Sequence, residues 1–153
     1  MVKKGLVNTL QEAFDKYLAD GAMAHFPKDK ITVEEGLDLI HTAGGIAVLA
    51  HPGQLKMADD VLLADLYKLK EMGLDGMECY YNDHSTERTN DLLDMAKRVG
   101  LAVSGGSDFH GAAKPHVFLG KASNGEGVPA NLLDGLKTAR DARQNAHQLV
   151  GVR

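Results

Sequence analysis

The hydrophobic positions along the chain follow two spacings, one typical of helices and one typical of buried strands. Apolar residues three and four positions apart predict helices over residues 9–19, 60–72 and 85–99. Short continuous apolar runs suit parallel strands that are covered on both faces. Three such runs alternate with the helical segments, at residues 46–50, 76–80 and 101–104. This alternation predicts an α/β fold with a parallel sheet.

Polar residues at the segment boundaries support these helices. Thr32 and Glu35 can form a capping box, in which each side chain bonds a backbone N–H of the other residue. A further helix is therefore expected to begin at Thr32 and to end at Gly44. Ser85 is a candidate N-cap for the segment that follows it, and Gly100 is its expected end.

The last third of the chain carries weaker signals. A short strand is predicted at residues 117–120, followed by a helix that begins near Pro129 or Asn131. Residues 139–153 are expected to form a helical or frayed tail. Basic and acidic residues alternate in this helix, which is typical of a solvated face. They are Asp134, Lys137, Arg140, Asp141 and Arg143.

Composition describes an ordinary globular chain. It has 153 residues, 44% of them apolar and 25% charged, which fits a single domain over residues 1–153. The net charge of −4 does not indicate a nucleic-acid or membrane surface, and no apolar run is long enough to span a bilayer. Cys79 is the only cysteine, so a disulfide within one chain is impossible and a cytoplasmic location is expected.

Candidate chemistry stands directly after the predicted strands. His51 follows the first strand, and Asp108 and His110 follow the third. The second strand contains Glu78, and His84 comes shortly after it. The carboxyl ends of parallel strands share one face, where ligands and catalysis gather. Imidazole and carboxylate groups are the usual ligands of zinc, manganese and iron.

Spacing brings two of these residues together. Asp108 and His110 stand two positions apart, so in an extended segment both side chains project to the same side. The glycines Gly105 and Gly106 before them allow a close approach of the backbone to a ligand. The sequence therefore predicts a metal or phosphate site at this edge of the sheet.

Three motifs in order carry a resemblance to a known family. They are ITVEEGLDLIHTAGGIAVLAHPG, GLDGMECYYNDHS and GLAVSGGSDFHG. They resemble the later motifs of the polymerase and histidinol phosphatase (PHP) domain, a metal-dependent phosphoesterase. The resemblance implies a distorted (β/α)7 TIM-like barrel that holds three divalent metals, manganese, iron or zinc. It also implies hydrolysis of phosphate monoesters in a small phosphorylated substrate such as a nucleotide or a nucleic-acid end.

The resemblance assigns a role to each matching residue. His51 matches a ligand of one metal, Asp108 a ligand of a second and His110 a ligand of the third. Asp108 and His110 are thus the implied catalytic residues. Glu78 and His84 match positions near the site, with supporting or phosphate-facing roles.

The family's opening HxH motif and the ligands that follow it have no counterpart in this sequence. The chain is therefore expected to be truncated, a partial barrel that corresponds to the C-terminal half to two-thirds of the domain. Each metal would then keep one protein ligand, whereas a stable zinc site needs three or four. Weak or absent metal binding and low activity are expected for this chain alone.

Two other functions remain open. The chain could be a non-catalytic remnant that binds a partner or itself, because missing strands leave open sheet edges that invite a homo-oligomer. It could also be a metal-dependent amidohydrolase, since histidine and aspartate at strand ends serve those enzymes too. Lys114 is expected to stay clear of the phosphate, and Tyr80 and Tyr81 are interpreted as packing residues.

Overall fold

The computed structural model describes residues 1–27, 30–122 and 125–150. Contacts within the chain divide it into two compact units, Met1–Ile31 and Thr32–Arg153. A single domain over residues 1–153 stays a prediction.

The first unit holds a short helical segment. The helix α1 (Leu10–Ala13) begins where the Thr9 hydroxyl accepts a hydrogen bond from the Glu12 backbone N–H at 3.0 Å. It continues as the π-helix η2 (Phe14–Leu18), so the helix predicted over residues 9–19 is confirmed. A 3₁₀ turn, η1 (Val2–Lys4), precedes it.

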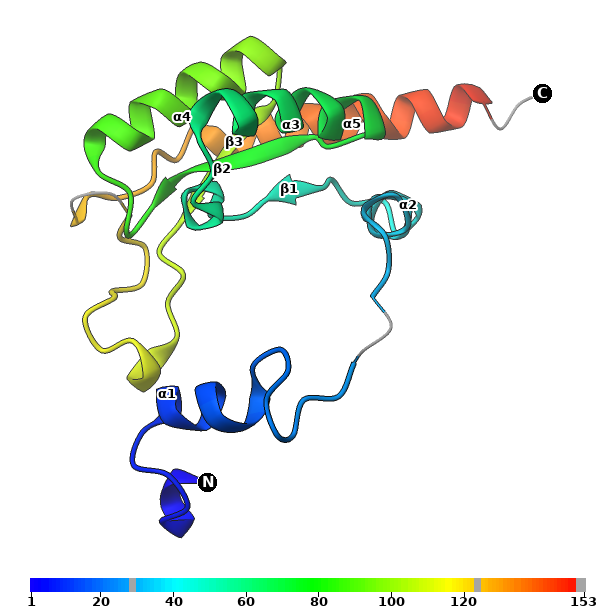
Figure 1. The fold of residues 1–153 in the computed structure, drawn as a ribbon. Helices are drawn as coiled ribbons and strands as arrows, with labels where there is room; N and C mark the ends of the chain where they lie inside the picture. The colour runs from blue at the N-terminus through cyan, green and yellow to red at the C-terminus, as the bar shows by residue number, and fades with distance from the viewer. Residues whose placement is uncertain (28–29, 123–124, 151–153) are drawn as a thin grey trace. The chain divides into compact units, whose positions relative to one another are not determined.

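The second unit is built on a three-stranded parallel sheet in the order β1–β2–β3 (Figure 1). The strands are β1 (Val48–Leu49), β2 (Gly76–Tyr81) and β3 (Ala102–Gly106). The predicted α/β fold with parallel strands is therefore confirmed. The first strand is shorter than the apolar run at residues 46–50, and the third reaches past the predicted residue 104 to Gly106.

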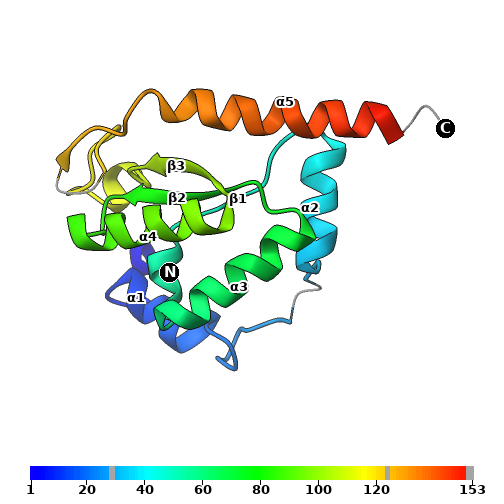
Figure 2. The same ribbon diagram turned by 90° about the horizontal axis from the view of Figure 1, so that it is seen from above.

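Helices connect and cover these strands. Figures 1 and 2 show α4 (Thr86–Val99) over β2, and α5 (Leu132–Val150) alongside β3. The helix α3 (Asp59–Met72) packs against α4. The Thr32–Glu35 capping box forms at the start of α2 (Val33–Thr42) as predicted. The Ser85 hydroxyl accepts a hydrogen bond from the Arg88 backbone N–H at 3.0 Å, which caps α4.

The core lies between the sheet and the helices α3 and α4. Met77 and Cys79 of β2 are fully buried, as are Leu66 of α3 and Leu92 of α4. Alternation along β2 leaves Glu78 half-buried, pointing away from this core. That position turns Glu78 toward the loops that follow the strands.

The strand predicted at residues 117–120 does not form. The chain after β3 makes a 3₁₀ turn, η4 (Gly111–Ala113), and then a bend in which Phe118 and Leu119 are 67% and 78% exposed. The pairing nearest to this run is an isolated antiparallel bridge between Lys121 and Gly127. An apolar run becomes a strand only where a neighbouring strand accepts its hydrogen bonds, and this run has no such neighbour among the described residues.

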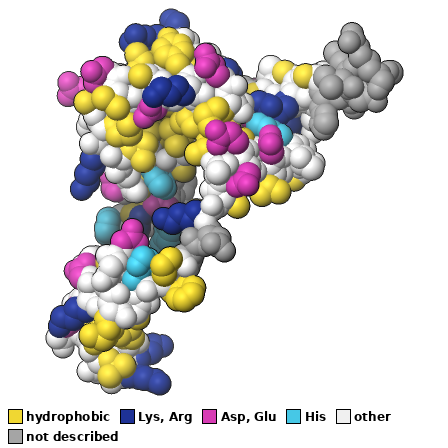
Figure 3. All heavy atoms as spheres, turned by 45° about the vertical axis from the view of Figure 1, so that its right-hand side comes forward, with side chains coloured by type: hydrophobic (Ala, Val, Ile, Leu, Met, Phe, Trp, Pro, Cys, Tyr) yellow, Lys and Arg dark blue, Asp and Glu magenta, His cyan; other side chains and the backbone are white. Residues whose placement is uncertain are grey.

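The tail at residues 139–150 is helical, as part of α5, and residues 151–153 lie outside the described part of the chain. No helix of the described residues is long and apolar enough to cross a membrane. Basic and acidic side chains alternate over the face of the molecule shown in Figure 3.

Candidate metal centre

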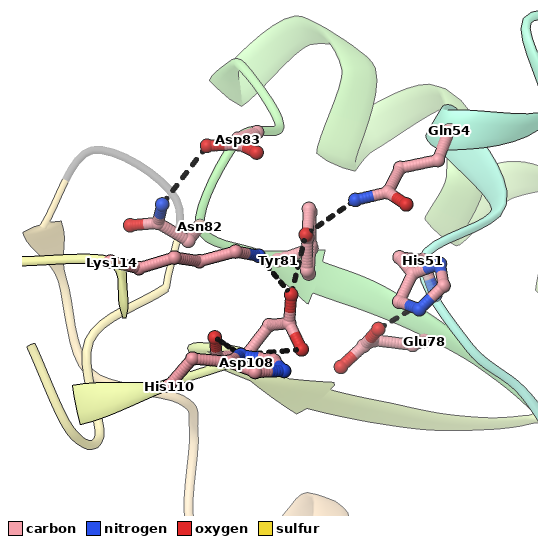
Figure 4. A network of polar contacts seen from close by, with 9 residues as sticks. All are labelled: His51, Gln54, Glu78, Tyr81, Asn82, Asp83, Asp108, His110 and Lys114. Carbon is pink, nitrogen blue, oxygen red and sulfur yellow. Dashed lines mark hydrogen bonds and ion pairs between the residues drawn. The ribbon is translucent and has the colours of Figure 1, made fainter. Parts of the chain in front are cut away.

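Three strand ends bring the predicted site residues to one edge of the sheet (Figure 4). His51 comes after β1, Glu78 lies within β2, and Asp108 and His110 come after β3. Because β1, β2 and β3 are adjacent and parallel, their carboxyl ends meet at this edge. His84 follows β2, and its ring lies beside that of Tyr81.

Glu78 holds the loop that carries His51. One carboxylate oxygen of Glu78 accepts a hydrogen bond from the His51 backbone N–H at 2.7 Å. His51 itself has a left-handed backbone, with φ 33° and ψ 58°, and begins the 3₁₀ turn η3 (Pro52–Leu55). A left-handed non-glycine residue costs roughly 1–3 kcal/mol and persists only where its surroundings hold it. The charge-assisted bond from Glu78 supplies that hold, and the supporting role expected for Glu78 stays a prediction.

Asp108 lies at the centre of a network of polar contacts. Its Oδ2 accepts hydrogen bonds from the Tyr81 hydroxyl at 3.1 Å and from the Lys114 ammonium at 2.5 Å. The bond from Lys114 is the main reason that the pKa of the Asp108 carboxyl lies below its ordinary value, and the Tyr81 hydroxyl lowers the pKa further. Asp108 is therefore an ionised acceptor throughout the neutral range.

His110 lies beside Asp108, but not for the predicted reason. Asp108 has a left-handed backbone with φ 52°, so the segment is not extended and the alternation argument is wrong. Instead, the turn brings His110 Nδ1 to 2.7 Å from the Asp108 carbonyl oxygen and 3.5 Å from its Oδ1. Nδ1 thus carries the proton, which leaves Nε2 as the nitrogen suited to a metal. The side chain is 55% exposed and can meet a ligand from solvent.

Tyr81 contributes a functional group that the sequence reasoning missed. Its ring is buried, as a packing residue should be, but its hydroxyl accepts a hydrogen bond from Gln54 Nε2 at 2.6 Å. The same hydroxyl donates to Asp108, so η3, β2 and the loop after β3 are joined through one oxygen. Burial raises the pKa of Tyr81, and the neighbouring Asp108 charge raises it further, so the hydroxyl stays protonated as a donor.

His84 is a buried histidine that contacts Tyr81. It is 6% exposed, and its Nδ1 lies 2.9 Å from the Cys79 carbonyl oxygen. Its Nε2 is buried without a hydrogen-bond partner among the described residues, and its ring centroid is 5.1 Å from that of Tyr81. The ring is buried beside Tyr81, and both roles expected for His84 stay predictions.

The types of donor group at this edge suit a divalent metal, but too few of them lie close together to hold one. The imidazoles of His51 and His110 and the Asp108 carboxylate are suited to manganese, iron or zinc. Among the described residues, no group of three histidine, cysteine or acidic side chains lies close enough to hold a metal ion. A closed metal site at this edge therefore needs ligands beyond those that the described residues bring together.

Comparison with known proteins indicates the class of protein to which this chain belongs. No family model matches the chain. The chain is 34% identical to the 5'-3' exoribonuclease Rnm of Escherichia coli over 121 residues, which are 79% of this chain and 41% of that protein. It is 32% identical to a 3',5'-nucleoside bisphosphate phosphatase of Chromobacterium violaceum over 110 residues, 72% of this chain and 39% of the relative. The chain thus spans about two-fifths of the length of these relatives.

Two solved structures agree with these relatives. An amidohydrolase from Chromobacterium violaceum, solved with bound sulfate and no metal, superposes with a TM-score of 0.68 at 28% identity, covering 90% of this chain and 48% of that one. A protein from Bifidobacterium adolescentis assigned as a metal-dependent phosphoesterase superposes with a TM-score of 0.67 at 27% identity, covering 90% and 47%.

The relatives are phosphoesterases, and the Bifidobacterium adolescentis protein is assigned as metal-dependent, which supports the use of divalent metals in the family. The chain belongs to the PHP family.

Proposed function

We propose that this chain forms the C-terminal part of a cytoplasmic, metal-dependent phosphoesterase built on a distorted (β/α)7 barrel. One observation carries the proposal: His51, which follows β1, and Asp108 and His110, which follow β3, lie at the carboxyl end of the same parallel sheet, on either side of β2. That is the end of a barrel at which catalysis occurs. In this view β1, β2 and β3 are three consecutive barrel strands.

Each residue of the site then has a part in the reaction. His51, Asp108 and His110 would each hold one divalent metal, and bound metal would polarise the phosphate and stabilise its developing charge. Glu78 orients the His51 loop, and Tyr81 fixes the rotamer of Asp108 through the bond at 3.1 Å. His110, exposed at the rim, is placed to meet the substrate.

A small phosphorylated molecule of the nucleotide class is the proposed substrate. Support comes from the relatives, one of which is an exoribonuclease and another a nucleoside bisphosphate phosphatase. Both act on phosphate esters of nucleosides, so the shared feature is a phosphate at the end of a nucleotide.

The test is an assay of the full chain with Mn²⁺ on a 3',5'-nucleoside bisphosphate. The expected result is slow phosphate release that is lost in His110→Ala and in Asp108→Asn. His25→Ala is the matched control, because His25 lies in the first unit, where it accepts a hydrogen bond from the Gly21 backbone N–H. Turnover that survives His110→Ala would contradict the assignment.

A second function is a non-catalytic module that associates with itself. It is favoured by the lack of three gathered donor groups among the described residues. The edge strands β1 and β3 also have an open side in the described sheet, and such edges pair with other chains. A dimer in light scattering, with neither Mn²⁺ binding nor phosphate release, would favour this function. Release of an amine from an amide substrate would favour an amidohydrolase.

A further inference from the structure

The Tyr81 hydroxyl joins two side chains that come from different loops. Gln54 lies in η3, after β1, and its Nε2 is 2.6 Å from the hydroxyl oxygen. Asp108 follows β3, and its Oδ2 is 3.1 Å from the same oxygen. Figure 4 shows the hydroxyl between the Gln54 amide and the Asp108 carboxylate. The three groups therefore form a short chain of hydrogen bonds across the end of β2.

The Asp108 carboxylate fixes the direction of each hydrogen bond in this chain. An ionised carboxylate only accepts, and its Oδ2 accepts from the Tyr81 hydroxyl and from the Lys114 ammonium. The hydroxyl has one hydrogen, which goes to Asp108, so its oxygen can only accept from Gln54. The side-chain amide of a glutamine can present either its NH2 group or its carbonyl oxygen. Only the NH2 group fits here, because the carbonyl oxygen would face the lone pairs of the hydroxyl oxygen.

We propose that Gln54 is a positioning residue for Asp108, because its amide N–H binds the acceptor side of the Tyr81 hydroxyl and so directs the hydroxyl hydrogen to the carboxylate. The inference rests on the proposed function for the part that Asp108 plays in the reaction. It adds that the loop after β1 orients an acid that follows β3, with Tyr81 of β2 as the link.

The turn that carries Gln54 also carries His51. The Gln54 backbone N–H donates to the His51 carbonyl at 3.0 Å, while its side chain donates to Tyr81. The ring centroids of His51 and Tyr81 lie 5.6 Å apart. Gln54 therefore holds His51 and Asp108 in a fixed relation to one tyrosine. Loss of its amide should weaken that alignment without unfolding the loop, because Gln54 is exposed and the bond from the His51 N–H to Glu78 remains.

A bond that only anchors η3 would act without regard to Asp108, whereas a directing bond depends on both ends of the chain. Gln54→Glu keeps the shape of the side chain but exchanges the NH2 group for an oxygen that only accepts at pH 7. That oxygen meets the lone pairs of the Tyr81 hydroxyl oxygen, so the fold favours the protonated form of the new carboxyl group, which donates as the amide did. The folded pKa of this group is thus raised. The loss of stability is full at pH 7 and disappears as the pH falls to the unfolded pKa of a glutamate, about 4.3.

The experiment is urea unfolding of the wild type, Gln54→Glu and Gln54→Leu from pH 7 to pH 4. At pH 7 the equilibrium constant of unfolding should rise about tenfold in Gln54→Glu and about fivefold in Gln54→Leu, the scale of one lost hydrogen bond. At pH 4 the increase in Gln54→Glu should shrink to about twofold or less, while that in Gln54→Leu should stay unchanged.

Two backgrounds provide the matched controls. Tyr81→Phe removes the hydroxyl but keeps the neighbouring charges, so the part of the Gln54→Glu effect that depends on pH should be lost there. Asp108→Asn supplies an NH2 group that can donate to the hydroxyl, whose hydrogen is then free to turn to the new carboxylate. The Gln54→Glu effect at pH 7 should therefore be several-fold smaller in Asp108→Asn. An effect of equal size with and without Asp108→Asn would overturn the inference, because Gln54 would then anchor η3 alone.

The phosphate-release assay tests the proposed function separately. Gln54→Leu should lower kcat several-fold and leave KM unchanged, because a misplaced carboxylate affects the reaction more than substrate binding. An unchanged kcat would refute the positioning role. A wild type that releases no phosphate, while the Gln54→Glu effect still depends on Asp108, would overturn the proposed function and leave the orientation of Asp108 by Gln54 standing.

Discussion

Gly53 and His84 meet at a contact that leaves no room for a larger residue. A Cβ at Gly53 would lie 2.5 Å from His84 Nε2. Gly53→Ala should therefore lower the free energy of unfolding by roughly 1–3 kcal/mol, the usual cost of overpacking. Gly135→Ala in α5 is the control: a Cβ there meets nothing within 4 Å, so the change should raise stability by about 0.5–1 kcal/mol. Urea unfolding measures both, and an unaffected Gly53→Ala variant would show that the His84 ring moves aside.

Cys79 should be unreactive in the folded protein. Its side chain is fully buried, and burial raises the pKa of the thiol to about 12, with the Glu78 charge adding to the effect. The thiolate that reacts with disulfide reagents is therefore almost absent at pH 8. We expect a thiol–disulfide indicator to give no fast reaction in buffer and one equivalent in denaturant. One equivalent of fast reaction in buffer would contradict the burial.

At the scale of single residues, the sequence predicted that Asp108, His51 and His110 lie at the strand ends. It did not predict the hydrogen bonds that orient them. His51, Asp108 and His110 follow apolar runs, and parallel strands bring such positions to one edge. The role of the Tyr81 hydroxyl could not be predicted, because the pairing of β2 with β3 changes register between Glu78 and Tyr80. A simple alternation of side chains along a strand does not predict such a register shift. It therefore does not predict to which face of the sheet the Tyr81 side chain points.

Among the elements, α2 depends most clearly on its N-cap residue, Thr32. The Thr32 hydroxyl accepts from the Glu35 N–H at 3.2 Å, and the Glu35 carboxylate accepts from the Thr32 N–H at 2.7 Å. Thr32→Ala removes the hydroxyl and should lower the free energy of unfolding by about 0.5–2 kcal/mol. Thr32→Ser keeps the acceptor and should stay close to the wild type. Thermal unfolding by circular dichroism separates the two, and equal melting temperatures in Ala and Ser would rule out a role for the cap.

Helices were easier to predict than strands for a physical reason. A helix makes its hydrogen bonds within its own segment, so the signals at Thr32, Ser85 and Gly100 are local and complete. A strand depends on a partner from elsewhere in the chain. The apolar run at residues 46–50 therefore predicts a longer first strand than the one that forms. The run at residues 117–120 predicts a strand that does not form.

Over the second unit as a whole, a buried carboxylate joins elements that are far apart in the sequence. Asp75, before β2, accepts hydrogen bonds from His41 of α2 at 2.9 Å, from Arg143 of α5 at 2.8 Å and from the Ala47 N–H at 2.8 Å. Arg143, predicted to lie on a solvated face, is in fact partly buried against this carboxylate. The pairing spans 68 residues, which local charge patterns cannot reveal.

This cluster lies at the amino ends of the strands, beside a cavity of about 840 Å³ that His41, Asp75 and Arg143 help to line. The candidate site occupies the opposite ends. In TIM barrels the amino-terminal face of the parallel sheet serves stability and the carboxy-terminal face serves catalysis, and we expect the same division for this parallel sheet. Changes at Asp75 should therefore affect unfolding without acting directly on the metal donors.

The pH dependence of unfolding tests this directly. Burial by itself would raise the pKa of Asp75, but the bonds from Ala47, Arg143 and His41 outweigh it and hold the pKa below the ordinary 3.8. Because the folded pKa is the lower one, the ionised form stabilises the fold fully above the unfolded pKa. That stability is lost as the pH falls through the folded value. Asp75→Asn should be less stable than the wild type at pH 7 by about 1–3 kcal/mol, the scale of hydrogen bonds to a charged group.

The deficit of Asp75→Asn should shrink as the pH falls below 4, because protonation then removes from the wild type the same charge that the variant lacks. Asp65→Asn removes an exposed carboxylate that pairs with Lys68, and it should follow the wild type at every pH. Urea unfolding from pH 7 to pH 3 gives the three curves. If the curves of Asp75→Asn and the wild type stay parallel down to pH 3, the charge of Asp75 does not hold the helices α2 and α5 to the sheet.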